Sequence, residues 1–160
     1  MERVQKIMEH RDFLYYLEEI EKEEENRIFC CHGIGHLLDV ARISYIFLLE
    51  SKVDIKKDIV YGTALLHDIG KIEQYRRKIP HEEVGVNLAY PILKSCGYED
   101  DEISLMIGAI ENHRFGREDK RHKLYESIHR ADKWSRNCMY CKAREECNWR
   151  ENEKNKRLIY

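Results

Sequence analysis

Four apolar stripes with helical spacing each contain a histidine or an aspartate, and this pattern constrains the fold of the chain more than any other feature. Residues three or four apart share one face of a helix, so these polar side chains prolong inward-facing stripes. The stripes are His36, Val40, Ile43 and Phe47; Val60, Ala64 and His67; Ile103, Met106, Ile107, Ile110 and His113; and Leu124, Ile128, Ala131, Asp132 and Ser135. Burying a carboxylate is costly unless a cation or a hydrogen bond compensates for it. The pattern therefore predicts a helical bundle with a metal centre inside it.

Proline and glycine are scarce, at two and eight of 160 residues, which favours helices over strands and turns. The sequence predicts an all-α bundle of about six helices, over residues 3–24, 33–50, 55–69, 82–95, 100–113 and 122–137. We expect Asp54 to cap the third helix and Gly97 to end the fourth. The charged run at 21–25 is interpreted as a solvated helix end.

Length and composition predict one helical domain over residues 1–137 and a separate cysteine-containing tail over 138–160, where cysteine and charge replace the apolar pattern. The net charge of −2 indicates no clear nucleic-acid partner and no attraction to an anionic membrane. No apolar run approaches the ~18 residues of a membrane span, and the charged N-terminus lacks the apolar core of a secretion signal. We therefore expect a cytoplasmic protein whose six cysteines are thiols or metal ligands rather than disulfides. A homodimer is left open.

The adjacent pair His67 and Asp68, in the stretch LLHDIGK at 65–71, places two metal-ligand types at the end of an apolar helix. Imidazole nitrogen and carboxylate oxygen together suit Fe, Mn, Co, Ni or Zn better than Ca or Mg. The sequence therefore predicts a divalent transition metal as the cofactor.

Three stretches in this order, HLLDVAR at 36–42, LLHDIGK at 65–71 and RADK at 130–133, resemble the HD superfamily. Its members are all-helical metal-dependent phosphohydrolases named for the adjacent His-Asp pair. The resemblance covers about residues 28–137. It implies that the ligands of one metal are His36, His67, Asp68 and Asp132.

The same resemblance implies a second ion, held by His81 and His113 with Asp68 bridging. The chain departs from the family where a further histidine often follows, because Arg114 stands there. One ion or two therefore remain open, and the alternative for the two histidines is contact with substrate phosphate or with each other's backbone. His32 is expected to orient His36 or to line the mouth of the pocket. The other histidines, His10, His122 and His129, are expected at the surface.

The implied activity is hydrolysis of a phosphomonoester or phosphoanhydride, as in a nucleotide, by a metal-activated water. Asp68 and Lys71 are the catalytic candidates, Asp68 aiming the water and Lys71 neutralising charge on the phosphoryl group. Lys71, Arg114 and Arg117 are candidate substrate contacts, against the alternative that both arginines belong to a solvated loop. Two other functions stay open: a di-iron oxygenase on the same fold, and a non-enzymatic metal- or nucleotide-sensing module.

The tail contains a CxxC pair, Cys138 and Cys141, followed by Cys147. Three thiolates in this spacing predict zinc or an iron–sulfur cluster, with Cys30 or Cys31 as a fourth ligand if the tail folds back. The tail resembles a cysteine-rich extension of some bacterial HD proteins, which assigns it no role. The alternative is reduced free thiols at a mobile end. Cys96 is interpreted as a small buried hydrophobic residue.

Overall fold

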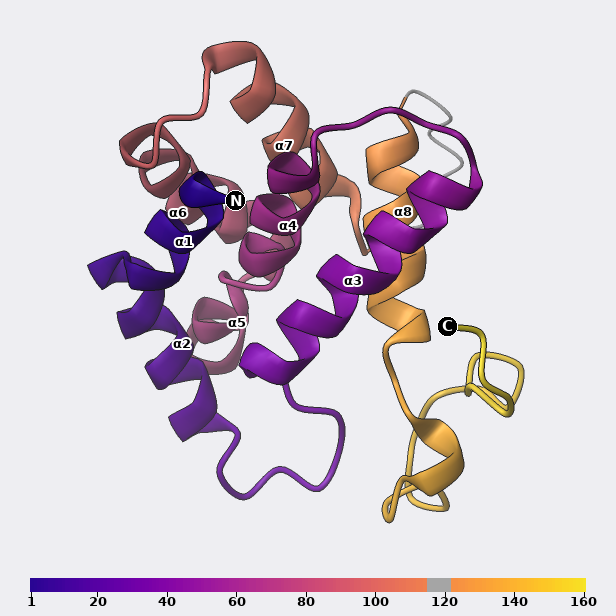
Figure 1. Ribbon diagram of the computed structural model, residues 1–160. Helices are drawn as coiled ribbons and strands as arrows, with labels where there is room; N and C mark the ends of the chain where they lie inside the picture. The colour runs from indigo at the N-terminus through magenta and orange to yellow at the C-terminus, as the bar shows by residue number, and fades with distance from the viewer. Residues whose placement is uncertain (115–121) are drawn as a thin grey trace.

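Helices form all the regular structure of residues 1–114 and 122–160, the part of the chain that the computed structural model describes (Figure 1). This confirms the all-α class. The helices are α1 (Glu2–Glu9), α2 (Arg11–Glu23), α3 (Ile34–Glu50), α4 (Lys57–Leu66), α5 (Lys71–Arg77), α6 (His81–Ser95), α7 (Asp100–Asn112), α8 (Lys123–Trp134) and the short 3-10 helix η1 (Cys138–Tyr140).

Helix α4 lies at the centre of the bundle and contacts α1, α3, α6, α7 and α8 (Figure 1). Seven of its ten residues are buried, including Ile59, Val60, Leu65 and Leu66. A helix that is apolar on every side is stable only when other elements surround it, so this sequence dictates the central position. The metal-ligand candidates His67 and Asp68 follow directly at its C-terminal end.

Several predicted helix limits are wrong. One helix over 3–24 is two, because the backbone at His10 is extended (φ −68°, ψ 128°) and its Nδ1 accepts a hydrogen bond from the Asp12 amide, 3.2 Å away. Asp54 does not cap α4, which begins at Lys57 without a side-chain cap. Gly97 ends α6 as expected: its φ is +86°, and its amide donates to the Lys94 carbonyl at 3.2 Å.

The expected helix over 55–69 ends early, and a helix that was not predicted follows it. Helix α4 stops at Leu66, residues 67–70 form a turn, and α5 begins at Lys71. This change of direction leaves His67 and Asp68 at a helix end instead of along a helix side.

Among the described residues, no helix has the length and apolar character needed to cross a membrane.

The tail leaves the end of α8, forms a series of turns and returns to the same helix end (Figure 1). The return is held by Asn155, whose Nδ2 donates to the carbonyl oxygens of Lys133 (2.8 Å), Trp134 (3.3 Å) and Arg136 (2.7 Å). The tail is therefore fastened to the C-terminal end of α8 by a single side chain. The Tyr160 ring also packs against that of Trp134, with centroids 5.4 Å apart.

Candidate metal centre

The turn at residues 67–70 brings the end of α4 and the start of α6 together beside Asp68. Within it, the Lys71 amide donates to the Asp68 carbonyl at 2.9 Å. Gly70 lies so close to the start of α6 that a Cβ there would be 2.1 Å from the carbonyl oxygen of His81. Only glycine fits this approach, which brings His81 beside Asp68.

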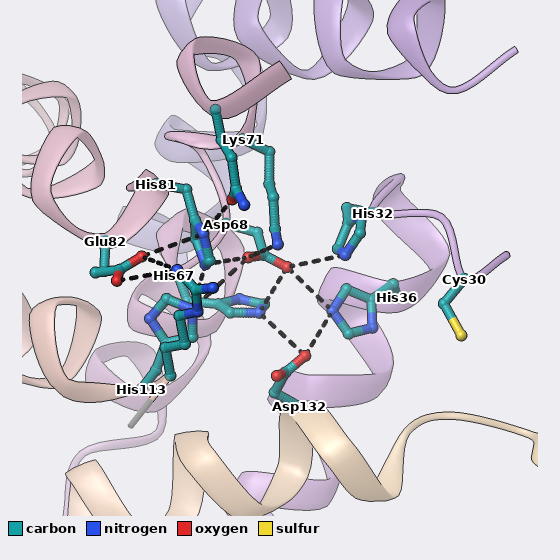
Figure 2. A network of polar contacts seen from close by, with 12 residues as sticks. Cys30, His32, His36, His67, Asp68, Lys71, His81, Glu82, His113 and Asp132 are labelled. Carbon is teal, nitrogen blue, oxygen red and sulfur yellow. Dashed lines mark hydrogen bonds and ion pairs between the residues drawn. The ribbon is translucent and has the colours of Figure 1, made fainter. Parts of the chain in front are cut away.

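Four predicted residues from three parts of the chain form the first group of donor atoms (Figure 2). Asp68 Oδ2 lies 3.2 Å from His67 Nε2 and 3.4 Å from His36 Nε2. Asp132, on α8, places its Oδ1 3.3 Å from His36 Nε2 and 3.8 Å from His67 Nε2. The side chains of His36, His67 and Asp68 are at least 94% buried, so this group is almost closed to water.

The other oxygen of Asp68 faces a second group, formed with His81 and His113. Asp68 Oδ1 lies 3.3 Å from His81 Nε2 and 3.7 Å from His113 Nε2, and the two imidazoles are 2.9 Å apart at Nε2. All three residues are buried. The structure thus brings all six predicted ligands together, with Asp68 shared between the two groups.

Each of the four histidines in these groups has its Nδ1 beside an oxygen outside the groups. The partners are Ser135 Oγ for His36 (3.2 Å), the Ala64 carbonyl for His67 (2.7 Å), Gln74 Oε1 for His81 (2.6 Å) and the Ile110 carbonyl for His113 (2.5 Å). An imidazole whose Nδ1–H donates to such an oxygen keeps an Nε2 lone pair for a metal. All four Nε2 atoms therefore face the Asp68 carboxylate as potential ligands.

The donor set fits a transition metal. His67 Nε2 and Asp68 Oδ2 are buried without a hydrogen-bond partner, which is rare for polar atoms unless an ion or water satisfies them. Two ligand atoms each ~2.1 Å from one ion lie ~3 Å apart when they subtend about a right angle. The separations of 3.2 Å and 3.4 Å around Asp68 Oδ2 are close to that value.

The charges at the centre favour a cation. Burial alone would raise the pKa of Asp68, but the neighbouring charges of His67 and Lys71 outweigh it and hold that pKa well below its ordinary value. Burial likewise opposes the ionisation of Asp132, yet the adjacent imidazoles of His36 and His67 keep its pKa well below the ordinary value. Two ionised carboxylates in a buried site attract a metal or a proton.

The pKa values of His81 and His67 are shifted in opposite directions. Burial lowers the pKa of His81 to about 2, so its imidazole is neutral and ready to bind a metal. For His67, burial acts in the same direction, but the carboxylates of Asp68 and Asp132 outweigh it and raise the pKa to about 10. Without a metal, a proton on His67 therefore compensates part of the negative charge.

The family model of the HD domain matches residues 33–151. The chain belongs to the HD-domain family. An uncharacterized protein of Clostridium beijerinckii (strain ATCC 51743 / NCIMB 8052) is 39% identical to it over 160 residues, the whole length of both chains. No solved structure matches it. HD domains form a superfamily of metal-dependent phosphohydrolases, in agreement with the His and Asp groups described above.

The predicted substrate contacts of this HD-domain protein lie at different distances from the centre. Lys71 Nζ is 3.8 Å from Asp68 Oδ1, and its side chain is 15% exposed, so Lys71 borders the second group. Arg114 is at the surface, where its Nη1 contacts Glu82 Oε1 at 3.3 Å. Arg117 lies outside the described residues.

Sequence reasoning missed Arg136, a buried cation at the first group. Its Nη2 lies 3.1 Å from both His36 Nε2 and Asp132 Oδ1, and its Nη1 donates to the Cys31 carbonyl at 3.1 Å. Its spacing of four residues from Asp132 is the one signal that could have placed it on the same face.

Sequence reasoning also missed the partners of His32. This histidine is buried, with its Nε2 3.9 Å from Asp68 Oδ2 and its Nδ1 in contact with Glu24 and with the Tyr75 hydroxyl. It borders Asp68 and also packs edge to face against His36, with ring centroids 5.6 Å apart. Glu24 is 5% exposed, so the interpretation of 21–25 as a wholly solvated helix end is wrong at this position.

The three remaining histidines were expected at the surface, and none is fully exposed in the structure. His10 and His122 each accept a backbone amide hydrogen bond at the start of a helix, which explains their partial burial. His129 Nδ1 lies 2.6 Å from the carbonyl of His113 and so supports the second group from behind.

Proposed function

We propose that this HD-domain protein is a metal-dependent phosphohydrolase that cleaves a phosphomonoester or a phosphoanhydride of a small molecule, with nucleotides as the substrate class. The observation that carries the proposal is the position of Asp68. One of its oxygens faces the Nε2 atoms of His36 and His67, and the other faces those of His81 and His113. A carboxylate shared by two sets of imidazoles can bridge two ions.

In this proposal His36, His67, Asp68 and Asp132 hold the first ion, and Asp68, His81 and His113 hold the second. The mixture of imidazoles and carboxylates favours Fe, Mn, Co, Ni or Zn. Such ions, when bound, lower the pKa of a coordinated water and polarise a phosphoryl oxygen.

The protein's own cations bind and orient the phosphate. Lys71, beside the second group, neutralises the negative charge that develops on the phosphoryl oxygens. Arg136, beside the first group, is already held by Asp132 and the Cys31 carbonyl, so we assign it to positioning Asp132 and not to the substrate. Arg114 reaches the substrate only by leaving Glu82, so we assign it to the entrance of the site. The proposed contact by Arg117 and the cytoplasmic location stay predictions.

The experiment measures phosphate release and metal content together. Purified protein is loaded with each of the five metals and assayed against nucleoside mono-, di- and triphosphates and an aryl phosphate. Asp68→Asn should lose both metal and phosphate release and keep the helical circular-dichroism spectrum. Asp39→Asn is the matched control, because Asp39 is 52% exposed and pairs with Arg42 on the outer side of α3.

Each alternative outcome contradicts a defined part of the proposal. Full metal occupancy in Asp68→Asn would refute the ligand assignment. Oxygen consumption with oxidation of an organic substrate, and no phosphate release, would identify a di-iron oxygenase. Nucleotide binding with bound metal and no turnover of any substrate would identify a sensing module.

A further inference from the structure

Glu24 and His32 form a buried pair of a carboxylate and an imidazole beside the metal centre. Glu24 Oε2 accepts the backbone amide of His32 at 2.7 Å, and Oε1 contacts both His32 Nδ1 and the Tyr75 hydroxyl. The side chains of Glu24 and His32 are 3% and 7% exposed. A carboxylate is buried this deeply only when hydrogen bonds compensate for its lost hydration. These contacts therefore fix both the carboxylate and the orientation of the imidazole.

The same contacts define which ring nitrogen of His32 carries the hydrogen. Burial opposes the ionisation of Glu24, yet hydrogen bonds from His32 and Tyr75 hold its pKa below the ordinary value. An ionised carboxylate only accepts hydrogen bonds, so Nδ1 of His32 is the protonated nitrogen. Burial lowers the pKa of His32, so the ring is neutral and its Nε2 is a hydrogen-bond acceptor.

His32 Nε2 faces a second acceptor, and neither atom can donate to the other. It lies 3.9 Å from Asp68 Oδ2, which is buried without a hydrogen-bond partner (Figure 2). Two acceptors that face each other need a hydrogen donor or a cation between them. When each is ~2.8 Å from one water oxygen and they subtend about a right angle there, the two acceptors lie ~4 Å apart. The observed separation therefore matches a bridging water.

The surroundings of His32 favour this water over a direct bond from His32 to an ion. Two ligands of one ion, each ~2.1 Å from it, lie at most ~4.2 Å apart. His32 belongs to neither group of donor atoms that lie within 4.8 Å of one another, so it is not a further ligand in this arrangement.

A small cavity reaches both His32 and Asp68. Its volume of about 10 Å³ is on the scale of one water molecule. Every other residue that lines it is apolar: Phe13, Leu17, Ile20, Leu37, Leu65 and Ile69. Within this lining, His32 and Asp68 are the side chains that can bind a water.

We propose that His32 is a further catalytic residue, whose Nε2 accepts a hydrogen bond from a water held against Asp68 Oδ2, and that Glu24 is its positioning residue. The inference rests on the phosphohydrolase function proposed above, which requires an attacking water. Asp68 Oδ2 is also the oxygen that faces His36 and His67, so this water lies beside the first group. With its two hydrogens directed at Nε2 and Oδ2, the water keeps its lone pairs free.

Nitrogen-15 NMR of the zinc-loaded protein, labelled at histidine, tests the arrangement without any substrate. We expect His32 to carry its hydrogen on Nδ1 and to have a bare, hydrogen-bonded Nε2. The signals that disappear in His32→Asn identify the residue. A hydrogen on Nε2, or a metal bound to it, would overturn the proposal.

Two substitutions of His32 separate its two hydrogen bonds. The amide nitrogen of asparagine takes the place of Nδ1, so His32→Asn keeps the bond to Glu24 and loses the acceptor at Nε2. The amide oxygen of glutamine reaches the place of Nε2, so His32→Gln restores that acceptor. His32→Asn should lower kcat about 100-fold with little change in KM, because the water loses its orientation. His32→Gln should recover part of the loss, and both variants should keep their metal.

His122→Asn is the matched control for these variants. His122 Nδ1 accepts the Leu124 amide at the start of α8, a role that asparagine also fills, so kcat and metal content should stay at the wild-type level.

Glu24→Gln tests the positioning role. The His32 backbone amide must face the oxygen of the new side chain, so its NH₂ group faces Nδ1 and donates to it. We expect the hydrogen of His32 to move to Nε2 and kcat to fall as in His32→Asn. An unchanged tautomer together with reduced kcat would contradict this role.

The outcomes separate this inference from the proposed function. Wild-type kcat in His32→Asn, or loss of metal from it, would refute the role of His32 and leave the phosphohydrolase function standing. If the unmodified protein releases no phosphate from any substrate, the proposed function fails, and the NMR measurement still tests the hydrogen bonding of His32.

Discussion

Replacing Gly70 with alanine tests the closest approach in the metal centre. A Cβ at this position would lie 2.1 Å from the His81 carbonyl oxygen and 2.7 Å from the Gly85 amide nitrogen. Both are backbone atoms, so no side-chain rotation relieves the contact. The backbone at Gly70 is ordinary helical (φ −75°, ψ −5°), which alanine adopts without strain. Any effect of Gly70→Ala therefore comes from the contact with α6.

The size of the effect follows from these distances. Ordinary contact begins near 3.4 Å, so the start of α6 must retreat by more than an ångström. Overpacking of this kind costs about 1–3 kcal/mol, and we expect about 3 because the obstacle is backbone. His81 moves with α6, and its Nε2 is 3.3 Å from Asp68 Oδ1. Gly70→Ala should therefore lose the second ion and keep the first, whose other ligands stand on α3 and α8 and at the end of α4.

Gly35→Ala is the matched control. Gly35 lies in α3, directly before the ligand candidate His36, and a Cβ there would meet no atom within 4 Å. An alanine in an open helical position stabilises by about 0.5–1 kcal/mol. Urea unfolding followed by circular dichroism gives the free energies, and metal analysis after dialysis gives the ions per chain. The reasoning is refuted if Gly70→Ala retains wild-type stability and both ions, or if the two variants lose equal stability.

Three further predictions concern other parts of the molecule. Hydrogen bonds from Arg3 and Lys56 lower the pKa of Glu102 to about 2, against 4.5 in an unfolded chain. The ionised Glu102 therefore stabilises the fold fully above pH ~4.5, and this stabilisation is lost as the pH falls toward ~2. Glu102→Gln should cost about 2 kcal/mol in urea unfolding at pH 7 and much less at pH 3; a cost that does not change with pH would contradict this. His81→Ala should halve the metal content and leave the fold intact, whereas loss of both ions would show that the groups fill together. Asn155→Ala removes three hydrogen bonds to the end of α8, so limited proteolysis should cut the tail faster and leave the bundle whole; unchanged cleavage would mean that other contacts hold the tail.

The sequence predicted most of the bundle because its helices follow the hydrophobic period. The stripe of α7, with Ile103, Met106 and Ile110, is buried as expected, and His113 follows it into the centre. A polar residue that continues an apolar face has a defined direction, so its approach to similar residues on other helices could be predicted. Periodicity gave no sign of the break at His10, because the extended backbone there is compatible with the same apolar pattern on both sides.

Charged residues that are buried by tertiary pairing escaped prediction for a physical reason. Glu24 belongs to a run of five charged residues and looks like its neighbours, yet it is buried because His32 and Tyr75 reach it from elsewhere in the chain. The burial of a charge depends on a partner that local sequence does not show. Helix α5 also escaped prediction, because it is a short helix that begins only where the chain turns after Asp68.

Arg136 connects the metal centre to the loop before α3. One guanidinium nitrogen contacts His36 and Asp132 at the metal centre, and another donates to the Cys31 carbonyl in that loop. Its Nε is buried without a partner, so the side chain is placed by these contacts and not by its own hydration. The loop before α3 and the carboxylate of Asp132 are therefore held by one side chain, which sequence periodicity alone could not place.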